Sequence, residues 1–198
     1  MGLWVLSESL RAWAEARVPD TDLPGLLRAA AAADPLRTVV DINDPRLLAP
    51  GTPDDDLPSR VAALAREAGE PVPTTPVEVT RCVLDSLAVA YRRHVRLAAT
   101  LAGRTVEAVH AVGGGTRNEL LCQLTADACG LPVLAGPAEA SALGNVLVQA
   151  RTLGVDLPDL AAMRDLVRRT HPPRRFEPRD DLDWVAAEAR LPAARKAE

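Results

Sequence analysis

The chain has 198 residues, of which 47% are hydrophobic and 25% are charged, and its formal net charge is -4 at pH 7. These values are typical of one ordinary globular domain with a sizeable core. The negative charge argues against a nucleic-acid partner, because such proteins concentrate Lys and Arg on one face. No run reaches the roughly 18 apolar residues of a membrane span, and no signal-peptide pattern opens the chain, so we expect a soluble, cytoplasmic protein.

Apolar residues at helical spacing predict an amphipathic helix over residues 2–16. Beyond it, a high density of Pro and Asp marks turns between short elements. We expect an Ala-rich helix that ends near Asp34, an extended piece over 38–42 and a further helix over 57–68.

The clearest helix signal begins at Thr75, which is suited to cap a helix whose first residue is Pro76. Glu78 stands three residues after the cap and is placed to bond back to it. Apolar residues then recur every three or four positions, and Gly103 is a plausible end.

A β-branched run over 106–112 predicts a strand that ends in Gly113-Gly114-Gly115 and leads into a helix carrying Leu120, Leu121 and Leu124. Glycines at such a turn let the backbone approach a ligand, and the helix N-terminus supplies unpaired N–H groups. A turn that needs positive φ for purely structural reasons would look the same, so the local pattern leaves both readings open.

The remaining elements are an extended piece over 131–135 and helices over 139–153, 158–169 and 180–195. Four arginines flank a Pro-Pro turn, and we interpret them as solvated surface: Arg168, Arg169, Arg174 and Arg175.

The three cysteines form no CxxC pair and are far in sequence from His110 and His171, so a zinc site has little support. Cys122 and Cys129 stand about 10 Å apart along one expected helix, which is too far for a disulfide. We expect these two thiols and Cys82 to be reduced core residues.

The residues present at key positions exclude two common nucleotide-binding motifs. A GxGxxG fingerprint on Gly113 and Gly115 would place its third glycine at Asn118. A P-loop needs Gly-Lys-Ser/Thr, and the only lysine is Lys196.

The stretch over 108–154, which contains GGGTRNELL, QLTADACGLPV and EASALGN, is similar to the adenosine-binding segment of the FGGY family of carbohydrate kinases. These three sequence segments resemble the rhamnulokinase branch of that family in particular. The segments RCVLDSLAVAYR at 81–92 and GLWVLSESLRAW at 2–13 also resemble it, in the same order, so the resemblance covers nearly the whole chain.

The resemblance implies an α/β, actin-like ATPase fold of the ribonuclease H-like type, in which two lobes close on ATP and a sugar. Residues 1–198 would be a partial C-terminal, nucleotide-binding lobe, helix-rich and lacking its first strands. Residues 108–154 would be its adenosine-binding core.

By matching position, Gly114 within the Gly113–Gly115 turn would line the nucleotide, and Asn118 would be in reach of the adenosine. Gly144 would let the following helix approach. Ser7 stands where the rhamnulokinase pattern has a nucleotide-contacting Gln, and its shorter side chain puts that contact in doubt.

Three further polar residues receive ordinary roles. We interpret Glu139 as an acid in the first turn of its helix, Asp127 as a solvated helical carboxylate and His110 as a core or edge histidine. No residue is assigned as catalytic and none as a metal ligand.

Phosphoryl transfer of this type needs a carboxylate base, Mg²⁺-bound phosphates and a closed cleft. In the family the base is an Asp of the N-terminal lobe, which has no counterpart here. The start Met1-Gly2-Leu3-Trp4 resembles an internal segment of the family, so we expect an internal start or a split or truncated gene. Loss of the first strands would leave an unpaired sheet edge and an uncovered apolar face, and hence poor solubility or a need for a partner.

The expected function is the ATP-binding part of a kinase that transfers the γ-phosphoryl group to a ketose such as L-rhamnulose, inactive as this fragment alone. The alternative is a non-catalytic nucleotide-binding or interaction module derived from the same lobe, and a third possibility is a decayed remnant. The sugar itself is set largely by the other lobe.

Overall fold

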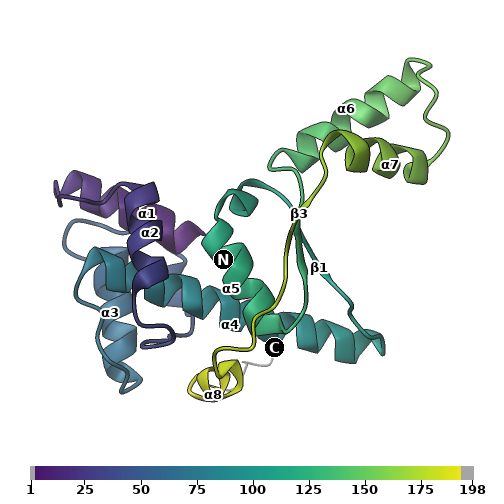
Figure 1. The fold of residues 1–198 in the computed structure, drawn as a ribbon. Coiled ribbons are helices and arrows are strands. Elements are labelled where there is room, and N and C mark those ends of the chain that lie inside the picture. Colours follow the sequence, from purple (N-terminus) through teal and green to yellow (C-terminus); the bar gives the residue numbers. More distant parts are fainter. Residues whose placement is uncertain (1–2, 193–198) are drawn as a thin grey trace.

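The computed structural model describes residues 3–192, so Met1, Gly2 and Lys196 lie outside the description (Figure 1). The bounds of the helix expected over 180–195 are wrong, because the described helix there runs only over Trp184–Ala189. Its helices are α1 (Trp4–Glu15), α2 (Leu23–Ala32), α3 (Leu57–Glu67), α4 (Pro76–Ala102), α5 (Glu119–Cys129), α6 (Ala140–Thr152), α7 (Leu160–Thr170) and α8 (Trp184–Ala189), with 3-10 turns η1 (Pro45–Leu47) and η2 (Gly114–Arg117). The strands are β1 (Val109–Ala111), β2 (Val133–Ala135) and β3 (Arg174–Phe176).

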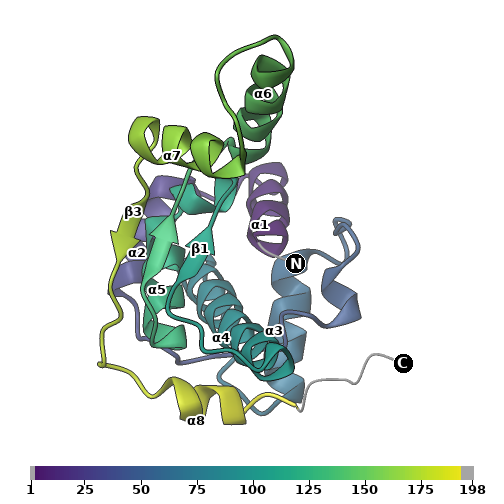
Figure 2. The same ribbon diagram turned by 90° about the vertical axis from the view of Figure 1, so that its right-hand side faces the viewer.

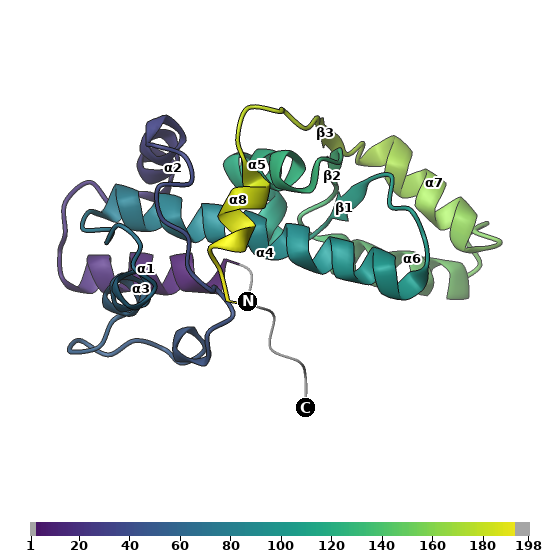
Figure 3. The same ribbon diagram turned by 90° about the horizontal axis from the view of Figure 1, so that it is seen from below.

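Helix α4 is the axis of the fold, and α1, α2, α3, α5 and α8 all contact it (Figures 1 and 3). Thr75 and Glu78 form the expected capping box, and Gly103 ends the helix at a φ of 59° in the left-handed region. Residues 79–90 of α4 are all buried. The largest of the fully buried side chains are Leu26, Ile42, Leu47, Leu57, Leu84, Leu87 and Leu124.

A buried ion pair fastens α2 and the segment after it to α4. Arg81 Nε lies 2.9 Å from Asp85 Oδ2, and Arg81 Nη1 donates to the carbonyls of Ala30 and Ala33. Asp85 also accepts from the Leu36 amide at 2.8 Å. Burial raises the pKa of the Asp85 carboxyl, although the Arg81 guanidinium opposes that shift.

The extended piece expected over 38–42 joins no described sheet. Its backbone bonds to side chains instead: the Val40 amide donates to Ser86 Oγ at 3.0 Å and the Val39 amide to Glu70 Oε2 at 3.2 Å. Val39, Val40 and Ile42 are buried in the core, which explains the apolar pattern without a strand.

The three strands form one sheet in the order β1-β2-β3, with β1 parallel and β3 antiparallel to β2. Val133 and Ala135 face the α5 side, where they pack with Cys122, Ala126 and Phe176. Strand β3 was not predicted, because its arginines were interpreted only as solvated surface. Arg174 and Arg175 are indeed exposed, and Phe176 is the strand residue that is buried.

All three cysteines are free, as expected. Cys82 and Cys122 are buried, whereas Cys129 is partly buried. Burial raises the pKa of the Cys82 thiol to about 12.

Helices α6 and α7 extend away from the rest of the molecule (Figures 1 and 2). Helix α6 has no buried residue, and α7 buries only Met163. The chain then returns through β3 to α8, where Trp184 and Ala187 join the core around α4. Within residues 3–192, no helix has the length and apolar character needed to cross a membrane.

Candidate functional site

The glycine turn follows β1 directly and is held by the backbone on both sides. The Gly113 amide donates to the Pro137 carbonyl at 3.1 Å, and the Gly113 carbonyl accepts from the Thr116 amide at 3.0 Å. Gly113 has a φ of 90°, which side chains of L-residues rarely adopt. The first glycine of the turn therefore has a structural reason to be glycine.

The next two glycines have no such reason. Neither Gly114 nor Gly115 has a positive φ. A Cβ atom on Gly114 would meet no other atom within 4 Å, and one on Gly115 would meet only Leu3 Cδ1 at 3.8 Å. Both residues are exposed, so their bare backbone borders space that a ligand could occupy.

Asn118 connects this turn to α5. Its Oδ1 caps the helix by accepting from the Leu121 amide at 2.9 Å, and the residue is 6% exposed. The other end of the amide, Nδ2, is buried without a hydrogen-bond partner. Because a buried unpaired donor costs about 1–3 kcal/mol, an acceptor atom of a ligand would be stabilised there.

Leu3, the residue that precedes α1, lies near the third glycine of the turn. A Cβ atom on Gly115 would meet Leu3 Cδ1, and the Ser7 amide donates to the Leu3 carbonyl, so Ser7 lies one helical turn further along the same side of α1. Ser7 is exposed. The structure thus brings α1 beside the predicted nucleotide turn, and no spacing in the sequence had marked Leu3 for this position.

Gly144 lies in α6 and does not serve the close helix approach expected of it. A Cβ atom there would meet no atom within 4 Å in the described chain, and the residue is exposed. Its connection to the glycine turn is indirect. Arg117 Nη2 lies 3.2 Å from Glu139 Oε1, and this exposed ion pair, not marked by the sequence, bridges η2 and the start of α6.

A cavity of about 900 Å³ lies between α6, α7 and the sheet face that carries His110 and Leu134. His110 is exposed on β1, the edge strand, in agreement with the edge interpretation. Most of the lining is apolar, and the α6 residues among it are Ala140, Leu143, Gly144, Leu147 and Val148.

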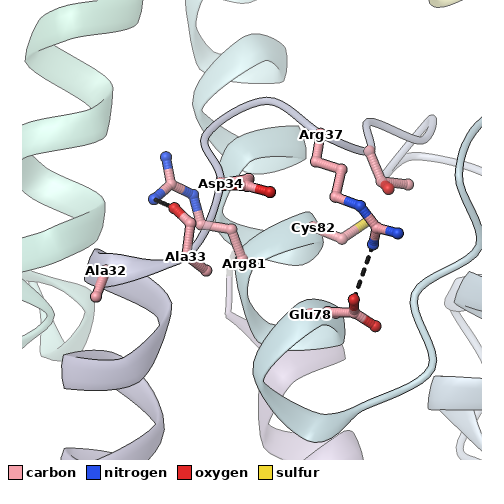
Figure 4. Close-up of a pocket in the computed structure, with 8 residues that line it drawn as sticks. Ala32, Ala33, Asp34, Arg37, Glu78, Arg81 and Cys82 are labelled. Carbon is pink, nitrogen blue, oxygen red and sulfur yellow. Dashed lines mark hydrogen bonds and ion pairs between the residues drawn. The ribbon is translucent and has the colours of Figure 1, made fainter.

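A second cavity, of about 430 Å³, lies where α2 ends against α4 (Figure 4). Arg37 and Glu78 bond across it at 2.9 Å, and Arg81 points to the carbonyls at the end of α2. These charged groups bond to one another or to the backbone, so we interpret this cavity as part of the packing contact between α2 and α4.

Asp127 differs from its predicted role as a solvated carboxylate. Its side chain is fully buried and bonds to Arg179, with Oδ2 2.6 Å from Nη2. Gln123 Nε2 also donates to Asp127 Oδ1 and to the Glu177 carbonyl, so these two α5 residues fasten the returning chain. Among residues 3–192, no group of three or more His, Cys, Asp and Glu side chains is placed to hold a metal ion.

Comparison with known proteins agrees with this geometry. The sequence profile of the FGGY family of carbohydrate kinases, C-terminal domain, matches residues 1–153. The rhamnulokinase of Bacteroides thetaiotaomicron is 37% identical over 186 residues, which cover 94% of this chain and 36% of that protein. The rhamnulokinase of Klebsiella pneumoniae is 41% identical over 183 residues, which cover 92% and 36%.

Among solved structures, the xylulose kinase of Rhodospirillum rubrum matches with a TM-score of 0.57 at 21% identity, covering 89% of this chain and 33% of that one. The expected fold, a helix-rich C-terminal lobe of the actin-like ATPase type, is confirmed. The chain spans only about a third of the length of these proteins.

Proposed function

Because the chain belongs to the FGGY family of carbohydrate kinases, we propose that it forms the ATP-binding part of a kinase that transfers the γ-phosphoryl group of ATP to a ketose. The rhamnulokinase relatives favour L-rhamnulose as that ketose. Residues 1–198 act as the nucleotide-binding lobe, residues 108–154 as its adenosine-binding core, and the protein works in the cytoplasm.

The observation that carries the proposal is the unpaired Asn118 Nδ2 beside open glycine backbone. An adenosine offers ring and ribose acceptors to such a donor, and a flat base fits against Gly114 and Gly115, where no side chain intervenes. Ser7 would contact the nucleotide from α1, and Gly113 fixes the conformation of the turn. Gly144 would border the site from α6, to which Glu139 connects the turn.

The chemistry of transfer needs more than these residues supply. Mg²⁺ would be held through the phosphates of the nucleotide and would neutralise charge as the phosphoryl group moves. The base that takes the proton of the sugar hydroxyl belongs to the remaining two thirds of the kinase length, so we expect this chain alone to be inactive.

Calorimetric titration with ATP and ADP tests the site. Asn118→Asp keeps the oxygen that caps α5 but removes the Nδ2 donor, so we expect nucleotide affinity to fall about tenfold or more with little change in melting temperature. Asn145→Asp, which adds the same charge on the exposed surface of α6, is the matched control and should bind like the wild type.

Gly114→Ala gives an independent test, because the structure has room for the added methyl group and the φ is not positive. We expect unchanged stability and weaker nucleotide binding. If neither ATP nor ADP binds the wild-type chain, or if both site variants bind as it does, the chain is a decayed remnant or its site lies elsewhere.

A kinase assay with L-rhamnulose separates the enzyme part from a non-catalytic nucleotide-binding or interaction module. Turnover that requires a separately supplied N-terminal part of the kinase supports the enzyme. Nucleotide binding without turnover in that mixture favours the module, and turnover by this chain alone would contradict the expected inactivity.

A further inference from the structure

Two short crossings join α6 and α7 to the rest of the molecule (Figure 2). We call these helices and the loop between them, residues 140–170, the arm. The outgoing crossing, residues 136–139, follows β2, and the return crossing, residues 171–173, leads into β3. Packing holds the arm weakly, because Met163 is the only buried residue of its two described helices. The orientation of the arm therefore depends largely on polar contacts at the two crossings.

Each crossing has an ion pair at its inner end, and both pairs lead to the same short segment. At the outgoing crossing, Glu139 Oε1 lies 3.2 Å from Arg117 Nη2. At the return, Arg174 opens β3 and pairs with Glu119, the first residue of α5. Arg117 and Glu119 are the two neighbours of Asn118 in the chain. Both pairs thus converge on the residue whose unpaired Nδ2 carries the proposed nucleotide site.

Fold stability does not account for these two ion pairs. The side chains of Arg117 and Glu139 are both 72% exposed, and those of Arg174 and Glu119 are 61% and 59% exposed. Exposed pairs contribute little to the free energy of unfolding. They do, however, join residues that are 22 and 55 positions apart, so they restrain the arm relative to residues 117–119.

We propose that Arg117 and Glu119 are positioning residues of the nucleotide site, which couple the orientation of the arm to the conformation of Asn118. The inference rests on the proposed function, because it takes Asn118 Nδ2 as a donor to the nucleotide. Neither charged side chain touches the nucleotide; each acts through Asn118. Such coupling is reciprocal, so a bound nucleotide restrains the arm and a restrained arm strengthens nucleotide binding.

Calorimetric titration of the whole chain with ADP and with adenosine tests the outgoing crossing. Arg117→Gln removes the pair, and we expect both affinities to fall about two- to threefold, as for an exposed pair. Arg117→Glu combined with Glu139→Arg restores opposite charges and should recover most of the loss. Glu67→Gln breaks a similarly exposed pair, 2.9 Å long, with Arg46 and is the matched control, which should bind like the wild type. Failure of the swapped pair to recover affinity would overturn the coupling.

The return crossing needs a double-mutant cycle, because its residues have other contacts. Glu119 also lies in the first turn of α5, and the Arg174 guanidinium lies 5.0 Å from the centre of the Phe176 ring. These contributions cancel when Glu119→Gln and Arg174→Gln are compared singly and together. The double variant should lose less affinity than the two single losses combined. Losses that simply add would show that the residues do not act as a pair and would overturn the coupling.

Two comparisons distinguish positioning from other causes. Adenosine has no phosphate, so a loss by Arg117→Gln that is confined to ADP would mean that Arg117 binds a phosphate, which would overturn its positioning role. Salt shortens the range of exposed charges to about 3 Å at 1 M. The ratio of wild-type to variant affinity for adenosine should therefore approach one in 1 M NaCl. A ratio that salt leaves unchanged would indicate a packing defect and would also overturn the proposal.

Hydrogen exchange of α7 measures the arm directly. None of the proposed nucleotide contacts lies in α7, so slower exchange there with saturating ADP reports coupling and not direct cover by the ligand. We expect this slowing in the wild type and a clear reduction of it in Arg117→Gln. ADP binding with unchanged α7 exchange would overturn this inference and leave the proposed function standing. If the wild-type chain binds neither ADP nor adenosine, the proposed function fails and this inference fails with it.

Discussion

Two ion pairs on helices show how differently the body around α4 and the region of α6 and α7 are built. Arg81 and Asp85 in α4 lie 2.9 Å apart with side chains 7% and 1% exposed, and Asp165 and Arg168 in α7 lie 2.8 Å apart with side chains 59% and 71% exposed. The first pair is surrounded by the core and bonds to α2, whereas the second is in solvent. The body around α4 therefore has a packed core, while α6 and α7 form an arm in which Met163 is the only buried residue of the two described helices.

The strongest test of this contrast is Asp85→Ala. The substitution leaves the Arg81 guanidinium buried without its carboxylate, and breaking such pairs costs about 3–5 kcal/mol of unfolding free energy. Urea unfolding at pH 7 measures the loss. A loss below about 1 kcal/mol would mean that water reaches Arg81 and that the two regions are less different than the structure indicates.

An intermediate effect is expected at the start of α4, where Glu78 accepts from the Thr74 and Thr75 amides. Glu78→Ala should lower stability at pH 7 by about 1 kcal/mol, as loss of a cap does. The backbone bond from Thr74 is the main reason that the pKa of the Glu78 carboxyl lies below its ordinary value of 4.5.

A depressed acid pKa stabilises the fold above the ordinary value, and this contribution is lost as pH falls through the folded-state pKa. The difference between wild type and Glu78→Ala should therefore shrink below pH 4.5. Glu78→Gln, which keeps an acceptor but cannot titrate, should be intermediate at pH 7. A difference that stays constant with pH would rule out the carboxylate as the cause.

The smallest effect is expected in the arm. Asp165→Ala removes an exposed pair, so the free energy of unfolding should change by no more than about 0.5 kcal/mol. The same urea titration measures it. A loss comparable with that of Asp85→Ala would show that the arm is packed in solution and would remove the contrast.

Features set by neighbouring residues could be predicted from the sequence. The cap formed by Thr75 and Glu78, the end at Gly103 and the glycine turn after β1 each depend on residues within a few positions of one another. The same holds for the helical period of α1, α3 and α5. These elements also carry the segments that resemble the kinase family.

Features set by distant residues could not be predicted. Asp127 became a buried partner only because Arg179 returns to it from the other side of β3. The segment at 38–42 has the apolar pattern of a strand but takes its hydrogen bonds from α4 and the loop before it. Likewise the helix cap at Asn118 and its unpaired Nδ2 are properties of the folded site, since the sequence singles out Asn118 only through the family resemblance, as a residue in reach of the adenosine.

The return of the chain to α8 also determines how the protein folds. Trp184 and Ala187 fill part of the core around α4, and Arg190 Nη2 donates to the Leu36 carbonyl, a contact between residues 154 positions apart in the sequence. Contacts of such long sequence separation slow folding, because the intervening chain must be ordered before they form. During synthesis the early helices therefore emerge from the ribosome before the segment that completes their core, and their apolar surface stays exposed until α8 arrives.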